Sequence, residues 1–198
     1  MMNLTEEEIA ARLAAAQTSI HTDASAYAQA GADAAKCAAV LVPLLPQDGD
    51  WHLLFTRRTD IVESHKGQVS FPGGACDDGE TTPEQTALRE AEEEIGLDPR
   101  AVHVLGRLNS MLTITSYRVT PVVGVIPWPT VFKPAQAEVA RVFTMPLRWL
   151  AERSNRWEFN MLGRDYSVIV YHPFDGEILW GATARMTVDL LEIITEKP

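Results

Sequence analysis

The stretch Arg89-Glu90-Ala91-Glu92-Glu93-Glu94-Ile95-Gly96-Leu97 carries more information about fold and function than any other part of the chain. As a helix of 3.6 residues per turn, it places Glu90, Glu93 and Glu94 within an arc of roughly 100°. Its apolar residues occupy a neighbouring arc that would face a core. Carboxylates this close repel one another, by roughly 0.2–0.5 kcal/mol per exposed pair, and a hard cation such as Mg²⁺ would remove that conflict. The alternative is a solvated acidic helix face.

The residues before this stretch favour the metal-binding interpretation. Thr82 is a predicted N-cap, Pro83 suits the first helical position, and Gln85 can complete a capping box. We therefore expect a helix over 82–95. Ahead of it, Phe71-Pro72-Gly73-Gly74 supplies a glycine turn at which the backbone can approach a ligand closely.

Together these segments resemble the Nudix box, the signature of the Nudix hydrolases. That pattern is a glycine, five residues, a glutamate, seven residues, and then Arg-Glu-apolar-x-Glu-Glu-x-Gly-apolar. Gly74 and Glu80 keep the first spacing, and the stretch from Arg89 to Leu97 matches the end. Eight residues rather than seven separate Glu80 from Arg89, which departs from the general box but occurs in one subgroup, the coenzyme A (CoA) pyrophosphatases.

A second segment resembles the same subgroup, whose members carry a pattern like Leu-Leu-Thr-x-Arg-Ser/Ala, three residues, Arg, three residues, Gly, three residues, Phe-Pro-Gly-Gly. The positions that match in register are Thr56, Arg58, Gly67 and the Phe-Pro-Gly-Gly at 71–74. Two positions depart from it: Thr59 replaces a small residue, and Glu63 stands where the pattern has arginine. If that arginine holds substrate phosphates, its role passes here to Arg58, Lys66 or another cation.

Composition limits the classes of partner. The chain has 198 residues, 46% of them apolar, so one domain over 1–198 is the default, with an N-terminal helical extension at 1–35 and the box at 74–97. A net charge of −10 would repel nucleic acid. No segment has the 18 or so apolar residues of a membrane span, and the N-terminus has acids where a signal peptide needs bases. We expect a soluble cytoplasmic protein with no nucleic-acid or membrane partner.

The two cysteines and five histidines lack metal-ligand spacing. The simple interpretation of Cys37 and Cys76 is two free thiols in a reducing compartment.

Periodicity and turn signals predict a mixture of helices and strands. The predicted helices are 5–15, 82–95, a short one near 145–150 and a closing one that ends near 194. The predicted strands are 38–45, 51–57, 68–71, 102–108, 119–126, 138–143, 157–161 and 166–171, with loops at 20–36 and 59–66 and a hairpin turn at 47–50. The fold class is α+β, and the resemblance implies a Nudix-type α/β/α sandwich around a mixed β-sheet.

The resemblance also implies a reaction, hydrolysis of a nucleoside diphosphate linked to another group, with Mg²⁺ or Mn²⁺ as cofactor. Mapped onto this chain, Glu90 and Glu94 are metal ligands, because residues four apart lie about 6 Å apart along a helix axis. Glu93 is a bridging ligand, the catalytic base, or a residue that only orients a ligand. Arg89 pairs with a carboxylate and fixes its rotamer, or forms a plain surface ion pair. Glu80 is interpreted as structural support, with metal ligation as the alternative.

Other candidates lie outside the acidic helix. Glu138 follows a proline-containing loop and is a candidate for a further catalytic glutamate, although an exposed loop acid is an equal interpretation. The candidate substrate contacts are Arg58, Lys66, Gly73, Gly74, Tyr117 and Arg118. For the cations Arg58, Lys66 and Arg118, the alternative is a solvated side chain. For Tyr117, the alternative is a structural role.

The expected function is cleavage of CoA or its derivatives into 4′-phosphopantetheine and adenosine 3′,5′-bisphosphate. The alternative within enzymes is a Nudix hydrolase for ADP-ribose, NADH or nucleoside triphosphates. Outside enzymes, the alternatives are a non-catalytic Nudix-fold binding module and an acidic interaction helix. The sequence leaves the oligomeric state open, a homodimer included.

Overall fold

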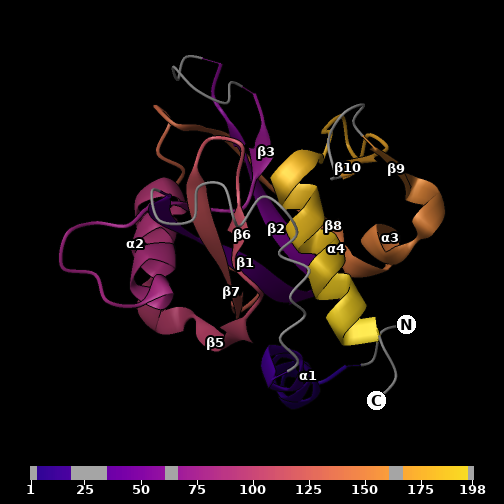
Figure 1. The fold of residues 1–198 in the computed structure, drawn as a ribbon, viewed down its shortest axis with the longest axis horizontal. Helices are drawn as coiled ribbons and strands as arrows, with labels where there is room; N and C mark the ends of the chain where they lie inside the picture. The colour runs from indigo at the N-terminus through magenta and orange to yellow at the C-terminus, as the bar shows by residue number, and fades with distance from the viewer. Residues whose placement is uncertain (1–3, 19–34, 61–66, 161–166, 196–198) are drawn as a thin grey trace.

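The structure is a computed structural model that describes residues 4–18, 35–60, 67–160 and 167–195 (Figure 1). Its helices are α1 (Glu6–Thr18), α2 (Pro83–Ile95), α3 (Leu147–Ala151) and α4 (Gly181–Thr195), with short 3₁₀ turns at Pro99–Ala101 and Arg153–Asn155. Its strands are β1 (Lys36–Gln47), β2 (Asp50–Arg58), β3 (Val69–Ser70), β4 (Gly73–Ala75), β5 (His103–Arg107), β6 (Met111–Leu112), β7 (Tyr117–Val125), β8 (Val139–Pro146), β9 (Arg156–Asn160) and β10 (Ser167–Tyr171).

Strands β1 to β8 form one mixed sheet with helices on both faces. Helix α2 packs on one face, and α1, α3 and α4 lie on the other (Figure 1). Only β1 and β7 pair in parallel; the other described pairs are antiparallel. The expected α+β architecture of a sheet between helical layers is therefore confirmed. None of the described helices is long and apolar enough to cross a membrane.

The predicted elements are present with small changes. The strand expected at 138–143 continues to Pro146, so the short helix begins at Leu147 rather than near 145. Strands β4 and β6 were not predicted, because each has three residues or fewer and no alternation of its own. The loops expected at 20–36 and 59–66 fall largely outside the described residues.

The two central strands separate, and this opening positions the glycine turn. Strand β1 pairs with β2 only as far as Leu44↔Leu53, and beyond that point its residues Ala38 to Val40 pair with β4. Strand β3 pairs with the far half of β2, and the amide of Leu41 donates to Pro72 O at 2.8 Å. The segment that joins β3 to β4 is thereby fixed within the sheet, on the path to α2.

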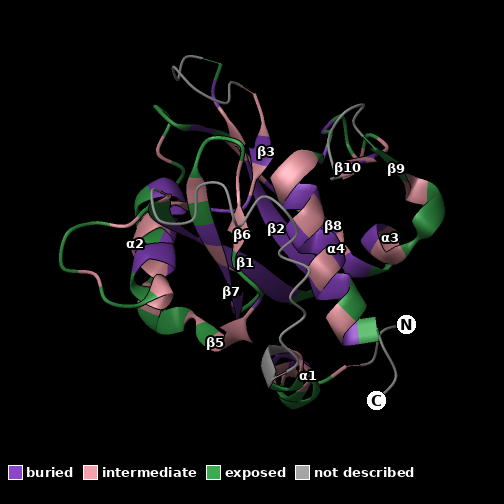
Figure 2. Cartoon of the chain, in the orientation of Figure 1, coloured by how far each residue is buried: buried purple, intermediate pink, exposed green. Residues whose placement is uncertain are grey.

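Buried residues form two cores, one on each face of the sheet. Figure 2 colours the buried residues of the sheet and of the helices purple. The smaller core joins α2 to the sheet through Ala87, Ala91 and Ile95, none of which is exposed. The larger core includes Ile9 and Leu13 of α1, which are also fully buried and should stabilise the fold by roughly 1.5–3 kcal/mol each. Helix α1 therefore packs onto the sheet and onto α4, as part of the larger core.

Candidate active site

Helix α2 begins and ends at the residues that its local sequence predicts. Thr82 accepts from the amide of Gln85, and the Gln85 side chain accepts from the Thr82 amide at 3.1 Å, which completes the capping box. Gly96 closes the helix in the left-handed conformation at φ 67°, which glycine adopts at little cost. These caps fix the rotation of α2, and with it the direction in which its acids point.

The acids of α2 differ sharply in burial. The Glu94 side chain is only 5% exposed and that of Glu90 only 18%, whereas Glu93 is 59% exposed and Glu92 lies on the surface. Glu90 packs directly over Gly74, where an added Cβ would lie 2.4 Å from the carboxylate oxygen. The glycine turn therefore gives Glu90 the space it occupies against the backbone of β4.

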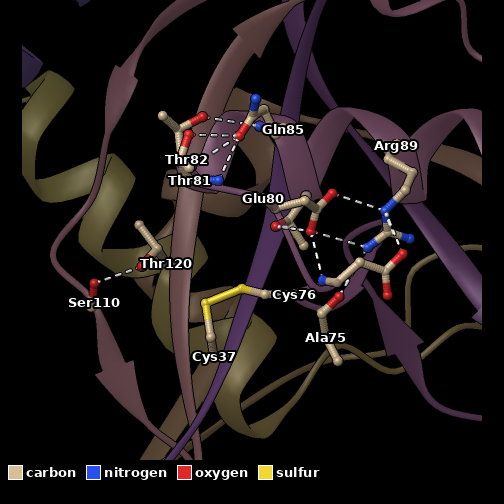
Figure 3. The surroundings of a disulfide bond; sticks show 12 residues. Cys37, Ala75, Cys76, Glu80, Thr81, Thr82, Gln85, Arg89, Ser110 and Thr120 are labelled. Carbon is tan, nitrogen blue, oxygen red and sulfur yellow. Dashed lines mark hydrogen bonds and ion pairs between the residues drawn. A yellow bond between two sulfur atoms is a disulfide. The ribbon is translucent and has the colours of Figure 1, made fainter.

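Arg89 gathers one set of acids, of which Figure 3 shows Glu80. Its Nη1 donates to Glu90 at 2.9 Å and to Glu93 at 3.0 Å, and its Nε donates to Glu80 at 2.9 Å. Its Nη2 donates to the carbonyl of Ala75 at 2.9 Å. Arg89 thus pairs with three carboxylates; that it fixes their rotamers for catalysis stays a prediction.

Glu80 joins the loop after β4 to α2. Its carboxylate accepts from Arg89, from the Thr86 hydroxyl at 2.7 Å and from the Asp77 amide at 2.8 Å. These donors, Arg89 first, lower the pKa of Glu80 to about 2. Three donors engage the Glu80 carboxylate, and its role as structural support stays a prediction.

Arg58 gathers a second set of acids. Its Nη1 lies 3.4 Å from Glu94 Oε1, and its Nη2 lies 3.9 Å from Glu138 Oε2. The loop that carries Glu138 is tied to the end of α2, because the Ala135 amide donates to Glu94 O at 2.9 Å. The fold therefore brings together three residues that are far apart in sequence, Arg58, Glu94 and Glu138.

Glu94 is the most perturbed acid of this set. Burial raises its pKa to about 7; Arg58 opposes that rise, and the charges of Glu90 and Glu138 add to it. Burial likewise raises the pKa of Glu90. Glu94 Oε2 and Arg58 Nε are buried and make no hydrogen bond within the described structure. An unpartnered buried carboxylate oxygen is costly unless something further binds it.

The donor set suits a hard divalent cation, which takes carboxylate oxygens as ligands. Glu94 offers a bare buried oxygen, and Glu90 lies beside it on the same face of α2. Among the described residues, no three His, Cys, Asp or Glu side chains are already gathered closely enough to hold one ion. The arginines hold the acids instead, so Glu90 and Glu93 would turn from Arg89 in order to share an ion with Glu94.

The other predicted substrate contacts are more scattered. Tyr117 and Arg118 begin β7, and Tyr117 packs against the larger core, on the face opposite α2. Arg118 is exposed and lies in register with Cys37 of β1. Lys66 and Glu63 lie outside the described residues.

The expectation of two free thiols is wrong: Cys37 and Cys76 form a disulfide (Figure 3). Cys37 lies one residue before the β1–β4 ladder, and Cys76 one residue after it. Because strand register brings them together, their sequence spacing gave no signal of pairing.

A hollow of about 560 Å³ opens beyond the C-terminal end of α2, lined by Glu92, Gly96, Asp98, Pro99, Arg100 and Lys133. It contains neither Glu90 nor Glu94 and is lined mostly by charged residues. Binding pockets are mostly apolar with a few convergent polar groups, so the buried acids rather than this hollow locate the site.

The fold and the site define a class of protein: a diphosphate hydrolase with an acidic helix that is packed across a glycine turn. The NUDIX domain model matches residues 35–164, so the chain belongs to the Nudix hydrolase family and is an enzyme. It is 40% identical over 164 residues to the "Uncharacterized Nudix hydrolase NudL" of Escherichia coli K12, covering 81% of this chain and 84% of that protein.

Solved structures agree on the fold. A Nudix hydrolase from M. smegmatis, RenU, matches with a TM-score of 0.51 and 26% identity, over 59% of this chain and 73% of that one. A MutT/nudix family protein from Enterococcus faecalis matches with a TM-score of 0.53 and 14% identity, over 79% and 60% of the two chains.

Proposed function

We propose that this Nudix hydrolase cleaves the diphosphate of CoA or a CoA derivative into 4′-phosphopantetheine and adenosine 3′,5′-bisphosphate. The observation that carries the catalytic part is the buried, unpartnered Glu94 oxygen beside Arg58. The CoA part rests on the subgroup pattern from Thr56 to the glycine turn and on the eight-residue spacing before Arg89. Structure supports the pattern to the extent that Arg58, one of its matched positions, reaches the acidic helix.

Mg²⁺ or Mn²⁺ is the proposed cofactor, and Glu90, Glu94 and Glu138 would hold it, with Glu93 as a further ligand if it does not act as base. When bound, the ion neutralises charge on phosphoryl oxygens and acidifies water. Glu93 is exposed, so once it turns from Arg89 it can accept the proton of the attacking water and pass it to solvent.

Arg58 is the proposed contact to the diphosphate. Its Nε is buried without a hydrogen bond in the described structure, and its contacts to Glu94 and Glu138, at 3.4 and 3.9 Å, are long. A guanidinium with spare donors pairs well with phosphate. Lys66, Arg118 and Tyr117, with the backbone at Gly73 and Gly74, stay proposed substrate contacts.

One assay panel tests this function. Initial rates with Mg²⁺ or Mn²⁺ are compared for CoA, ADP-ribose, NADH and a nucleoside triphosphate. We expect the highest kcat/KM for CoA. Equal or better turnover of ADP-ribose would remove the CoA assignment in favour of the alternative, and no turnover of any substrate would favour a binding module.

We also propose that residues 1–198 act as one Nudix domain, with α1 as its N-terminal extension. Location in the cytoplasm stays a prediction, and the Cys37–Cys76 pairing removes the free-thiol argument for it. Nucleic acid and membranes stay unexpected partners, because the charge of −10 is unfavourable for anionic surfaces.

A homodimer is proposed through the outer face of β9 and its neighbours. Trp157, Phe159, Ile178 and Trp180 are each 45–53% exposed. Val170 pairs with both tryptophans, so the two flank one strand. Half-exposed side chains of this size leave about 100 Å² each, roughly 400 Å² in all, which is about half of one partner's share of a standard interface.

Light scattering across a concentration series tests the dimer. We expect association that the double variant Trp157→Ser, Phe159→Ser abolishes, whereas Trp128→Ser, an exposed tryptophan elsewhere, leaves it unchanged. A monomer at every concentration refutes it.

A further inference from the structure

The Cys37–Cys76 disulfide lies at the edge of the active site. It joins the start of β1 to the residue directly after β4, with the Cα atoms 5.4 Å apart. Cys37 is exposed and Cys76 is partly exposed, so small molecules in solution can reach the sulfurs. Beyond the β1–β4 ladder, the Cys76 amide donates to Cys37 O at 3.1 Å.

Both neighbours of Cys76 contact the residues that position the acids, and Figure 3 shows Ala75 beside Arg89. Ala75, before it, accepts from Arg89 at 2.9 Å. Asp77, after it, donates its amide to Glu80 at 2.8 Å, and its carboxylate lies 3.4 Å from Arg89. The disulfide therefore anchors the segment 75–80, which holds Arg89.

Arg89 carries this anchoring into the acidic helix. It donates from one nitrogen to Glu90 and Glu93, and from its Nε to Glu80. Displacement of 75–80 would remove three of its partners, the Ala75 carbonyl, the Asp77 carboxylate and Glu80. Arg89 could then redistribute toward Glu90 and Glu93, the acids that must be free for catalysis.

We propose that Cys37–Cys76 is a site of reversible exchange with small thiols and dithiols, and that its redox state controls how firmly the segment 75–80 holds Arg89. The kinetic consequence rests on the function proposed above, whereas the exchange and the loosening of the segment do not. In the reduced protein the contacts of 75–80 weaken and turnover falls.

The exchange balances in two steps. A small thiolate attacks the exposed Cys37 sulfur, a mixed disulfide forms, and Cys76 leaves as a thiolate that takes up a proton. A second small thiolate attacks the small-molecule sulfur of the mixed disulfide and releases Cys37. In sum, two thiols are oxidised to one small disulfide, and two electrons reduce the protein disulfide to two thiols.

Redox titration of the full chain tests the proposal. The protein is equilibrated in buffers of reduced and oxidised glutathione, and the fraction of disulfide is read by mass spectrometry after alkylation. Hydrogen exchange of 75–80 is measured in parallel, together with kcat and KM for the best substrate of the panel. We expect reduction to speed exchange of the Asp77 amide at least tenfold and to lower kcat three- to tenfold, with less change in KM.

Two variants and a control sharpen the result. Cys37→Ser and Cys76→Ser should each show the fast Asp77 exchange and low kcat of the reduced protein at every glutathione ratio, because the one remaining thiol can form only a mixed disulfide with glutathione and cannot restore the link between β1 and β4. Ser154→Cys, an exposed position on the far 3₁₀ turn, adds a thiol away from the site and should leave the response intact. Unchanged Asp77 exchange on reduction, or unchanged kcat in a protein that turns over any panel substrate, would overturn the proposal. If no substrate is turned over but exchange still responds, the proposed function fails and the redox site stands.

Discussion

Replacing Glu94 with glutamine tests the electrostatic basis of the site. The side chain is 5% exposed, and burial raises the pKa of its carboxyl from 4.5 to about 7. Because one pKa unit corresponds to about 1.4 kcal/mol, ionised Glu94 costs the metal-free fold about 3 kcal/mol relative to its neutral form. Glutamine is nearly isosteric and neutral, and its amide oxygen can still accept from Arg58.

The pH dependence of the stability follows from the linkage between proton binding and folding. A raised carboxyl pKa means that the unfolded chain releases the proton first, so stability falls as pH rises from about 4.5 through about 7. With metal removed by chelation, Glu94→Gln should therefore be more stable than the parent by roughly 2–3 kcal/mol at pH 8.5 and nearly equal at pH 4. Urea unfolding at both pH values measures the difference.

With a divalent ion present, the parent protein should be the more active of the two, although Glu94→Gln is the more stable without metal. Glu94→Gln should lose Mg²⁺-dependent stabilisation and lower kcat on the order of 10²–10³-fold, as the loss of one key charge contact does in other enzymes. Glu92→Gln, on the exposed side of the same helix, is the matched control and should change neither. A Glu94→Gln protein that is destabilised at pH 8.5, or that retains parental activity, would refute this reasoning.

Three further predictions follow from the contacts around the site. Glu80→Gln should destabilise the protein by roughly 1–3 kcal/mol at pH 7, reduced from the full pKa effect for solvent screening. Because the pKa of Glu80 is lowered to about 2, this difference should vanish in unfolding curves as the pH falls from 4.5 toward 2; a difference that persists at pH 2 would contradict it. Gly74→Ala should weaken Mn²⁺ binding and kcat at least tenfold, because the new methyl group meets the Glu90 carboxylate; titration calorimetry measures the affinity, and parental Mn²⁺ binding would exclude the close packing. Arg58→Lys should raise KM more than it lowers kcat, because lysine keeps the charge but loses the forked donor; steady-state kinetics decide, and an unchanged KM would remove Arg58 as a substrate contact.

Local signals made much of the fold predictable. The N-cap at Thr82 and the stop at Gly96 predicted α2 to within one residue, because caps act within a single turn of chain. A helix start was predicted at 5 as well, and there the Thr5 amide donates to Glu8 at 2.7 Å. The resemblance to the Nudix box likewise depends on one short segment.

Contacts between distant segments were beyond the reach of these signals. The pairing of β4 with β1 decides that Cys37 meets Cys76, and no pattern in either segment records that register. The meeting of Arg58, Glu94 and Glu138 depends on where β2, α2 and the loop before β8 converge. Sequence reasoning identified all three residues as candidates, but only the fold shows that one arginine lies between the two acids.

Two arginines partly neutralise the charge of the clustered acids in the structure. Arg89 takes Glu80, Glu90 and Glu93, and Arg58 takes Glu94 and Glu138, so each group of like charges has a positive centre. The compensation is unequal, because Arg89 makes hydrogen bonds near 2.9 Å whereas Arg58 lies 3.4 Å or more from its acids. The weaker group contains the bare oxygen of Glu94. Glu94 is therefore the acid at which a divalent cation would be stabilised most. With Glu94 and Glu138 engaged by the ion, Arg58 would be left to pair with the diphosphate, and Glu90 would turn from Arg89, which keeps Glu80.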